Sequence, residues 1–160
     1  MTVGADATEC DAGVAELYRT RRNAMVRLAY VLTRDAEVAD DVVQEAFIAL
    51  HRNWADVEQH AAYLRTAIVN ACHSHHRRLR TARNAPTERP AIVEAPVRSL
   101  DHDLDSALRR LSRDDRVVLA LRYLEDLDDV EIAAVVGVSR STVRTRAQRA
   151  LDRLRKELGR

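Results

Sequence analysis

Aromatic residues are scarce in this 160-residue chain, making up 4% of it. Its core must therefore be aliphatic, and the many Leu, Val and Ala residues favour helices over sheets. Three prolines and four glycines argue against extended disorder. Two cysteines are too few for a disulfide framework. Neither a signal peptide nor a long apolar run is visible, so we expect a cytoplasmic protein without membrane insertion.

The near-neutral net charge of +1 conceals charges that are segregated along the chain. Residues 35–45 contain five acids and no basic residue, whereas residues 65–83 contain five arginines and no acid. Such blocks indicate separate surfaces for separate partners, although solvated helix faces are the simpler explanation. Lys156 is the only lysine among 26 basic residues. Arginine suits phosphate and guanine contacts, but the codon bias of a GC-rich genome is the simpler explanation of the preference.

The N-terminal half has the apolar periodicity of three helices. We expect them over residues 14–32, 35–54 and 61–83, after a frayed tail at residues 1–10. Three helices with short connections form an antiparallel bundle. All three prolines fall within residues 84–101, which we therefore interpret as an extended linker.

Near the C-terminus, the sequence predicts two helices joined by a tight turn. Asp128 and Glu131 have the spacing of a capping box, in which each side chain bonds the other residue's backbone N–H. Gly137 can adopt positive φ and end the first helix. Ser139 is the natural N-cap of the second helix.

The second of these helices has two different faces. Apolar side chains recur at helical spacing on one side: Val143, Ala147, Ala150, Leu151, Leu154 and Leu158. At about 100° per residue, the opposite side carries polar residues: Ser141, Arg144, Thr145, Gln148, Arg149 and Asp152. A short helix, a glycine turn and an arginine-rich second helix are typical of a helix-turn-helix, whose second helix enters the major groove of DNA. An ordinary solvated helical hairpin is the alternative.

The overall prediction is an all-α protein with two small helical domains. The first, residues 11–83, resembles a three-helix bundle, and the linker at residues 84–101 joins it to the helix-turn-helix domain at residues 102–160. Within the second domain, Ser112 and Asp115 have the spacing of another capping box.

Three stretches together resemble one protein family. DAEVADDVVQEAFIAL has an acidic stretch ending in a Gln-Glu pair before an aromatic residue. AYLRTAIVNACHSHHRR is a helix that ends in an Asn and a basic cluster, and LSRDDRVVLALRYLEDLDDVEIAAVVGVSRSTVRTRAQRALDRLR covers most of the C-terminal half. In this order they resemble an extracytoplasmic-function RNA polymerase sigma factor of the sigma-70 family, of the minimal type with regions 2 and 4 only.

The resemblance implies a bacterial, nucleoid-associated protein that is neither an enzyme nor dependent on a cofactor. Such a protein binds core RNA polymerase, through the clamp of the largest subunit and the flap of the second largest, and directs it to promoter DNA. An anti-sigma factor is a further implied partner. The residues implied in docking on the polymerase clamp are Asp40, Asp41, Gln44 and Glu45. An acidic helix surface complements a basic partner, although a solvated first helical turn is the simpler interpretation.

Region 2 of the family engages the −10 promoter element and opens its strands. The positions that match this role are Tyr63, Arg65, Thr66, Asn70, Arg77 and Arg78. The Asn70 amide can donate and accept hydrogen bonds at an unstacked base, and Arg80 joins the arginines as a phosphate partner. The loop between Trp54 and Tyr63 is short for the family.

Region 4 of the family recognises the −35 element through the second helix of its helix-turn-helix. Base contacts are implied for Arg144, Thr145, Gln148 and Arg149, which lie on the polar face described above. Backbone contacts, which fix register without reading sequence, are implied for Arg140, Ser141, Thr142 and Arg146. Ser141 stands where the family often has glycine.

The sequence has three alternative interpretations: a stand-alone regulator, a catalytic protein and a metal-binding protein. A stand-alone helix-turn-helix regulator would bind duplex DNA without polymerase. A catalytic protein such as a nuclease lacks support, because no nucleophile with a base and no phosphate-binding glycine loop is visible. A metal site could be sought among Cys72, His73, His75 and His76, but no distant acid or histidine pair completes it, and no metal is expected.

Overall fold

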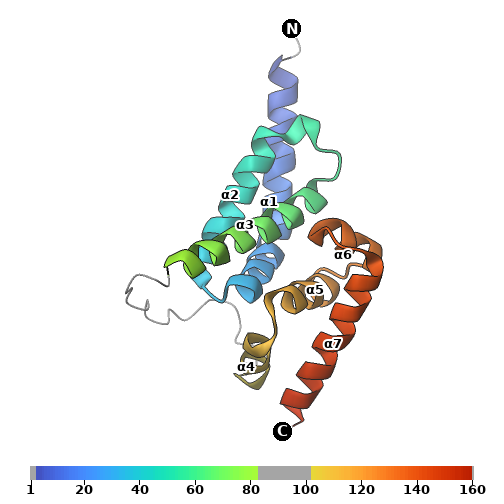
Figure 1. The fold of residues 1–160 in the computed structure, drawn as a ribbon. Helices are drawn as coiled ribbons and strands as arrows, with labels where there is room; N and C mark the ends of the chain where they lie inside the picture. Colours follow the sequence, from blue (N-terminus) through green and yellow to red (C-terminus); the bar gives the residue numbers. More distant parts are fainter. Residues whose placement is uncertain (1–2, 83–101, 160) are drawn as a thin grey trace.

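The computed structural model describes residues 3–82 and 102–159, and all regular structure in these ranges is helical, as predicted (Figure 1). The expected linker at residues 84–101 lies outside the described residues. The elements, in chain order, are α1 (Val3–Thr33), α2 (Ala36–Arg52), the 3-10 helix η1 (Trp54–Asp56), α3 (His60–Ala82), α4 (His102–Arg110), α5 (Arg113–Tyr123), α6 (Asp129–Val136) and α7 (Arg140–Leu158). Among the described residues, none of these helices combines the length and apolar character that a membrane span requires.

Helices α1, α2 and α3 pack together along their apolar sides. Asp35 caps α2, because its carboxylate accepts hydrogen bonds from the backbone N–H groups of Glu37 and Val38 at 3.0 and 3.1 Å. The buried aliphatic side chains include Met25, Leu28, Leu32, Val43, Leu50, Leu64 and Ile68. This aliphatic core agrees with the scarcity of aromatic residues.

Most of the tail that we expected to be frayed is helical, because α1 begins at Val3 and includes residues 3–10. The end of α2 contacts these early turns: Asp11 lies 2.7 Å from His51, and the Cys10 thiol lies 3.8 Å from the His51 carbonyl oxygen. A Cβ at Gly13 would collide with the ring of Trp54, so that glycine permits close packing there. Contacts with residues that are distant in sequence thus support the first turns of α1.

Helices α4 to α7 form the second group, with α6 and α7 as the helix-turn-helix. A small apolar cluster of Leu108, Leu111, Leu119 and Ala150 holds α4 against α5 and α7. The largest apolar core continues from α1–α3 into α5, α6 and α7. The two groups therefore share one buried core, as Figure 1 shows where α5 and α6 lie beside α1 and α3.

Ion pairs also cross between the two groups. Arg65 of α3 donates to Glu125 at 2.8 Å, and Arg21 of α1 lies 3.9 Å from the same carboxylate. Arg34, at the end of α1, pairs with Asp105 of α4. The division into domains at 11–83 and 102–160 stays a prediction, but in this structure the halves are packed together.

Candidate nucleic-acid interface

The turn between α6 and α7 has the caps that the sequence predicts. Asp128 accepts from the Glu131 N–H, and Glu131 accepts from the Asp128 N–H, each at 2.9 Å, so the capping box is complete. Gly137 has φ 71°, the left-handed conformation that ends α6. Ser139 accepts from the Thr142 N–H at 3.2 Å and begins α7. Local chemistry thus fixes the angle at which α7 leaves α6.

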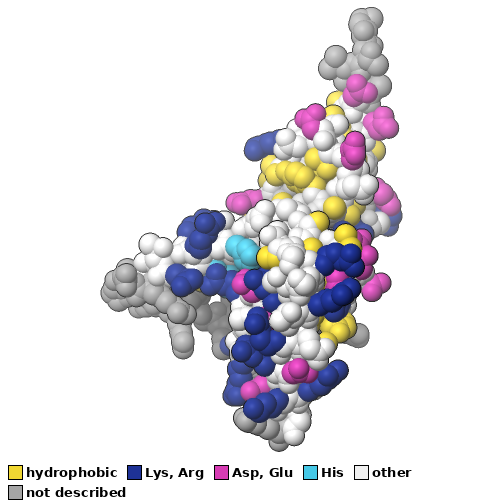
Figure 2. Space-filling model, turned by 45° about the vertical axis from the view of Figure 1, so that its right-hand side comes forward, with side chains coloured by type: hydrophobic (Ala, Val, Ile, Leu, Met, Phe, Trp, Pro, Cys, Tyr) yellow, Lys and Arg dark blue, Asp and Glu magenta, His cyan; other side chains and the backbone are white. Residues whose placement is uncertain are grey.

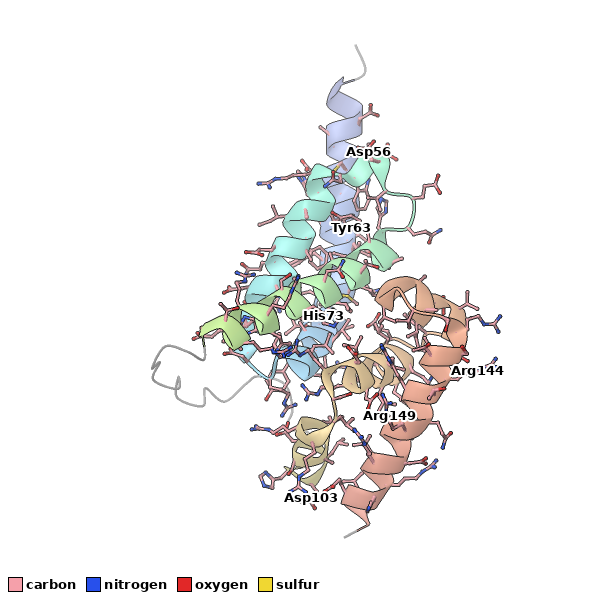
Figure 3. The ribbon with its side chains drawn as sticks, in the orientation of Figure 1. Asp56, Tyr63, His73, Asp103, Arg144 and Arg149 are labelled. Carbon is pink, nitrogen blue, oxygen red and sulfur yellow. The ribbon has the colours of Figure 1, made fainter. Side chains whose placement is uncertain are left out.

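The predicted apolar and polar faces of α7 are both present. Val143, Ala147 and Ala150 are buried, Leu151 and Leu154 are half-buried, and Leu158 is exposed. The opposite face is exposed: Ser141, Arg144, Thr145, Gln148, Arg149 and Asp152. Figure 3 shows Arg144 and Arg149 on α7, and Figure 2 shows basic side chains gathered over this part of the molecule.

Nearby carboxylates hold the long polar side chains of this face. Arg144 donates to Asp129 of α6 at 3.0 Å. Gln148 donates to Asp152, one helical turn further along, also at 3.0 Å. Arg149 makes a two-pronged contact with Asp115 of α5, with nitrogen-oxygen distances of 2.6 and 3.2 Å. Three long polar side chains of this face, Arg144, Gln148 and Arg149, thus have hydrogen-bond partners within their own helix group.

Asp115 anchors this network, and its side chain has no exposed surface. Burial disfavours its charged form. Hydrogen bonds from Arg149 and Ser112 and the charges of Arg149 and Arg153 outweigh burial, so the pKa of Asp115 is lowered. Of the predicted Ser112–Asp115 capping box, the structure has the Ser112 hydroxyl accepting from the Asp115 N–H at 3.2 Å. The Asp115 carboxylate is turned to Arg149 instead.

The candidate −10 residues lie along α3 in different environments. Asn70, Arg77 and Arg78 are exposed, whereas Tyr63 and Thr66 are half-buried. The Arg77 guanidinium donates to Ser74 at 3.4 Å. The exposed members can therefore meet a nucleic acid directly.

Arg65 is the exception among these residues, because it lies at the junction of the two helix groups. Its side chain is 13% exposed, and Glu125, whose side chain is 1% exposed, accepts its hydrogen bond. A nucleic acid can reach this guanidinium only after the Arg65–Glu125 contact opens.

The acidic residues of α2 also divide into two kinds. Asp40 is half-buried and forms an ion pair with Arg22 of α1. Asp41, Gln44 and Glu45 are exposed, and Ile48, one turn further on, is 52% exposed. Spacing of three, four and seven residues places this exposed set on one helix face, which we call the α2 face.

The cysteine and two of the histidines considered for a metal have other surroundings in the structure: the His75 and His76 rings lie 5.9 Å apart, and His73 lines a cleft with His76. Cys72 is buried, which raises the pKa of its thiol to about 12. His76 contacts the Leu32 carbonyl oxygen at 2.7 Å. The metal-ligating groups that the described residues do bring together are Cys10, Asp11 and His51, with one ligand atom of each within 4.8 Å of the others.

Sequence reasoning missed three acids that organise these surfaces: Asp115, Glu125 and Asp129. The sequence predicts Asp115 only as a member of a capping box, and Asp129 is a first-turn acid of the kind that a helix dipole favours. Glu125 lies in the α5–α6 connection, and its partner is 60 residues away in sequence. No local pattern points to such a contact.

Both halves match models of known protein regions. Residues 17–82 match the model described as Sigma-70 region 2, and residues 101–154 match Sigma-70, region 4. The RNA polymerase sigma-E factor of Streptomyces coelicolor is 33% identical over 152 residues, covering 89% of this chain and 84% of that protein. The ECF RNA polymerase sigma factor SigM of Mycobacterium tuberculosis is 30% identical over 154 residues, covering 90% and 76%.

A solved structure has a similar fold over nearly the whole chain. The sigma factor RpoE from Bartonella quintana, crystallised in complex with the anti-sigma factor NepR, superposes with a TM-score of 0.77 at 27% identity. The match covers 91% of this chain and 96% of that one. The similarity therefore includes both helix groups.

Proposed function

This chain belongs to the extracytoplasmic-function RNA polymerase sigma factors, and from that premise we propose how its surfaces share the work of initiation. The protein is a promoter-recognising sigma factor. We assign −35 recognition to α7, −10 engagement to α3 and polymerase docking to the α2 face. The assignment rests on one observation: the polar face of α7 is exposed, and α7 follows a fully capped turn.

The α7 face suits a major groove, because its side chains carry the donors and acceptors that read base edges. Arg144 and Arg149 are candidates for bidentate contacts to guanine, and Gln148 for adenine. Thr145 lies on the same exposed face. Arg140, Ser141 and Thr142, at the start of α7, are assigned to phosphate contacts that fix its register.

Helix α3 is assigned to the separated −10 strand. Asn70 is exposed midway along the helix and can read an unpaired base with its amide. Arg77 and Arg78 follow on its exposed end and suit backbone phosphates. Tyr63, Arg65 and Thr66 would join this surface once the contacts around Arg65 open.

The α2 face, with Asp41, Gln44, Glu45 and Ile48, is assigned to the polymerase clamp. An exposed apolar side chain amid acids suits an interface with a small apolar centre and charge complementarity around it. Asp40 supports this face through Arg22. The C-terminal helix group is assigned to the polymerase flap, and an anti-sigma factor is proposed as a regulator on the similarity to RpoE, which was solved with one.

Transcription in vitro tests the proposal. The purified chain is added to core RNA polymerase on genomic DNA, and transcript start sites are mapped against a core-only reaction. Defined starts preceded by shared −35 and −10 sequences are expected. If no starts appear beyond the core-only control, promoter direction by this chain fails. Tight duplex binding without polymerase would instead support the stand-alone regulator.

A further inference from the structure

The junction between α3 and α5 contains a cleft of about 800 Å³. We propose that this cleft binds a small anion carrying two or more phosphate groups, which bridges the two helix groups. Figure 3 shows His73 on α3 at this junction, and Figure 2 shows histidine and basic side chains gathered together.

The cleft has a strong excess of positive charge. Arg77 and Arg80 line it from α3, and Arg113 and Arg116 line it from α5. Asp114 is the one acid among the described residues of the lining, so these residues carry a formal charge of +3 with the histidines neutral. Asp114 also forms an ion pair with Arg146, at 3.5 Å, so its negative charge is shared with an arginine outside the cleft.

Among the described residues, these arginines have no carboxylate partner. Within residues 6–82 and 102–159, neither Arg80 nor Arg113 forms an ion pair. Arg116 donates to the carbonyl oxygens of Leu108 and Leu111 at 3.0 and 3.2 Å, which leaves its charge uncompensated. Cations held close together without counter-charge raise the free energy of the packed state, and a bound anion would lower it.

His73 provides a second, independent observation. Its Nε2 atom is buried without a hydrogen-bond partner among the described residues. A buried polar atom left unpaired carries a desolvation cost, so it marks a place where a ligand atom can gain a hydrogen bond. Burial lowers the pKa of His73; Arg113 and Arg77 lower it further, against the opposing effect of Asp114.

The ligand class follows from the shape and the charge. The volume lies within the range of about 300–1,000 Å³ typical of sites for small molecules. Arginines come from both walls, so a ligand with several charged groups can satisfy both. The first residues of α5, Arg113 and Asp114, also line the cleft, so the positive end of that helix dipole favours an anion there.

The basic surface of α7 is a useful contrast. A hollow of similar volume lies beside Arg144 and Arg149. Those arginines are already paired with Asp129 and Asp115, so a small anion gains less there. Because the cleft needs both α3 and α5, its ligand would favour the packed arrangement of the two groups.

Isothermal titration of the purified full-length chain with sodium tripolyphosphate, at constant ionic strength, tests the site. We expect saturable binding and a rise in melting temperature of about 3–8 °C. Arg113→Gln and Arg80→Gln should each weaken binding about fivefold to tenfold. The matched control is Arg155→Gln, an exposed arginine of α7 outside the cleft, which should bind normally.

Two further ligands, ATP and a single-stranded oligonucleotide, test which class of phosphate compound the cleft binds. ATP that binds more tightly than tripolyphosphate would extend the proposal to nucleotides, and equal binding would support recognition by phosphates alone. Absence of saturable tripolyphosphate binding overturns the proposal, as does equal weakening in all three variants. Binding of a single-stranded oligonucleotide alone would make the cleft part of the DNA path instead. These measurements contain no polymerase or promoter, so their failure would leave the proposed sigma-factor roles untouched.

Discussion

Helices α7 and α3, to which we assign −35 and −10 recognition, differ in where the ion-pair partners of their arginines lie. On α7, Arg144 and Arg149 are paired with acids of their own helix group, Asp129 and Asp115. On α3, Arg65 is paired with Glu125, which belongs to the other helix group. The ion pairs of Arg144 and Arg149 would remain if the two helix groups separated, whereas the Arg65–Glu125 ion pair would break.

This difference implies different readiness for DNA. The partners of Arg144 and Arg149 lie within one helix group, so these arginines can exchange carboxylates for DNA without any change between the two groups. Arg65 must first exchange Glu125 for another partner, so full engagement of α3 depends on opening the junction. We infer that −35 recognition is available in the packed protein, while −10 engagement is conditional.

Arg149→Ala tests the assignment of α7 to −35 recognition and should have the largest effect. A bidentate base contact contributes about 1–3 kcal/mol of discrimination, so initiation at the cognate promoter should fall about tenfold to hundredfold. Transcription in vitro with core polymerase measures this. Competition for core polymerase should be unchanged. Equal loss of core binding and promoter use would contradict the assigned role, and Arg155→Ala serves as a matched α7 control.

Asn70→Ala tests the assignment of α3 to the −10 element, at a position that is exposed in the packed protein. Loss of amide hydrogen bonds to an unpaired base should reduce open-complex formation about tenfold, while duplex binding by the holoenzyme is retained. Permanganate footprinting follows strand opening, and a pre-melted template should restore transcription. No rescue on that template would count against a role of Asn70 in strand separation.

The features that sequence predicted well are those fixed by near neighbours. The capping box at Asp128 and Glu131, the positive φ of Gly137 and the cap at Ser139 depend on residues within one helical turn. The exposed face of α7 follows from helical periodicity alone. These features define the helix-turn-helix, and they can be predicted without a structure.

The features that sequence did not predict depend on distant partners. Glu125 meets Arg65 only when α5 and α6 pack beside α3, and the turns before residue 11 are supported by the far end of α2. Asp115 sits where a capping box is expected, but Arg149, 34 residues away, takes its carboxylate. Periodicity predicts which side of a helix is buried and leaves open which helix covers it.

Glu125→Gln tests whether the junction restrains α3. The substitution keeps the size of the side chain and removes its charge, which weakens its bond to Arg65. Binding of a single-stranded −10 oligonucleotide to the free protein should rise about fivefold, as expected for a loss of about 1 kcal/mol. Fluorescence anisotropy measures it, and Glu58→Gln, an exposed acid of the η1–α3 loop, is the control. Unchanged affinity would mean that Arg65 is restrained by something other than Glu125.

The smallest expected effect concerns Asp115, the buried acid that pairs with Arg149 of α7. Because the pKa of Asp115 is lowered in the folded protein, its ionised form stabilises the fold at pH values above the unfolded pKa, about 3.9. That stabilisation is lost as pH falls through the lower, folded pKa. Asp115→Asn should therefore melt about 2–4 °C below the wild type at pH 7, with a gap that narrows under acid. Scanning calorimetry from pH 7 to pH 3 measures the gap, with exposed Asp56→Asn as control. A gap that stays constant across this range would show that Asp115 stabilises the fold through packing and not through its charge.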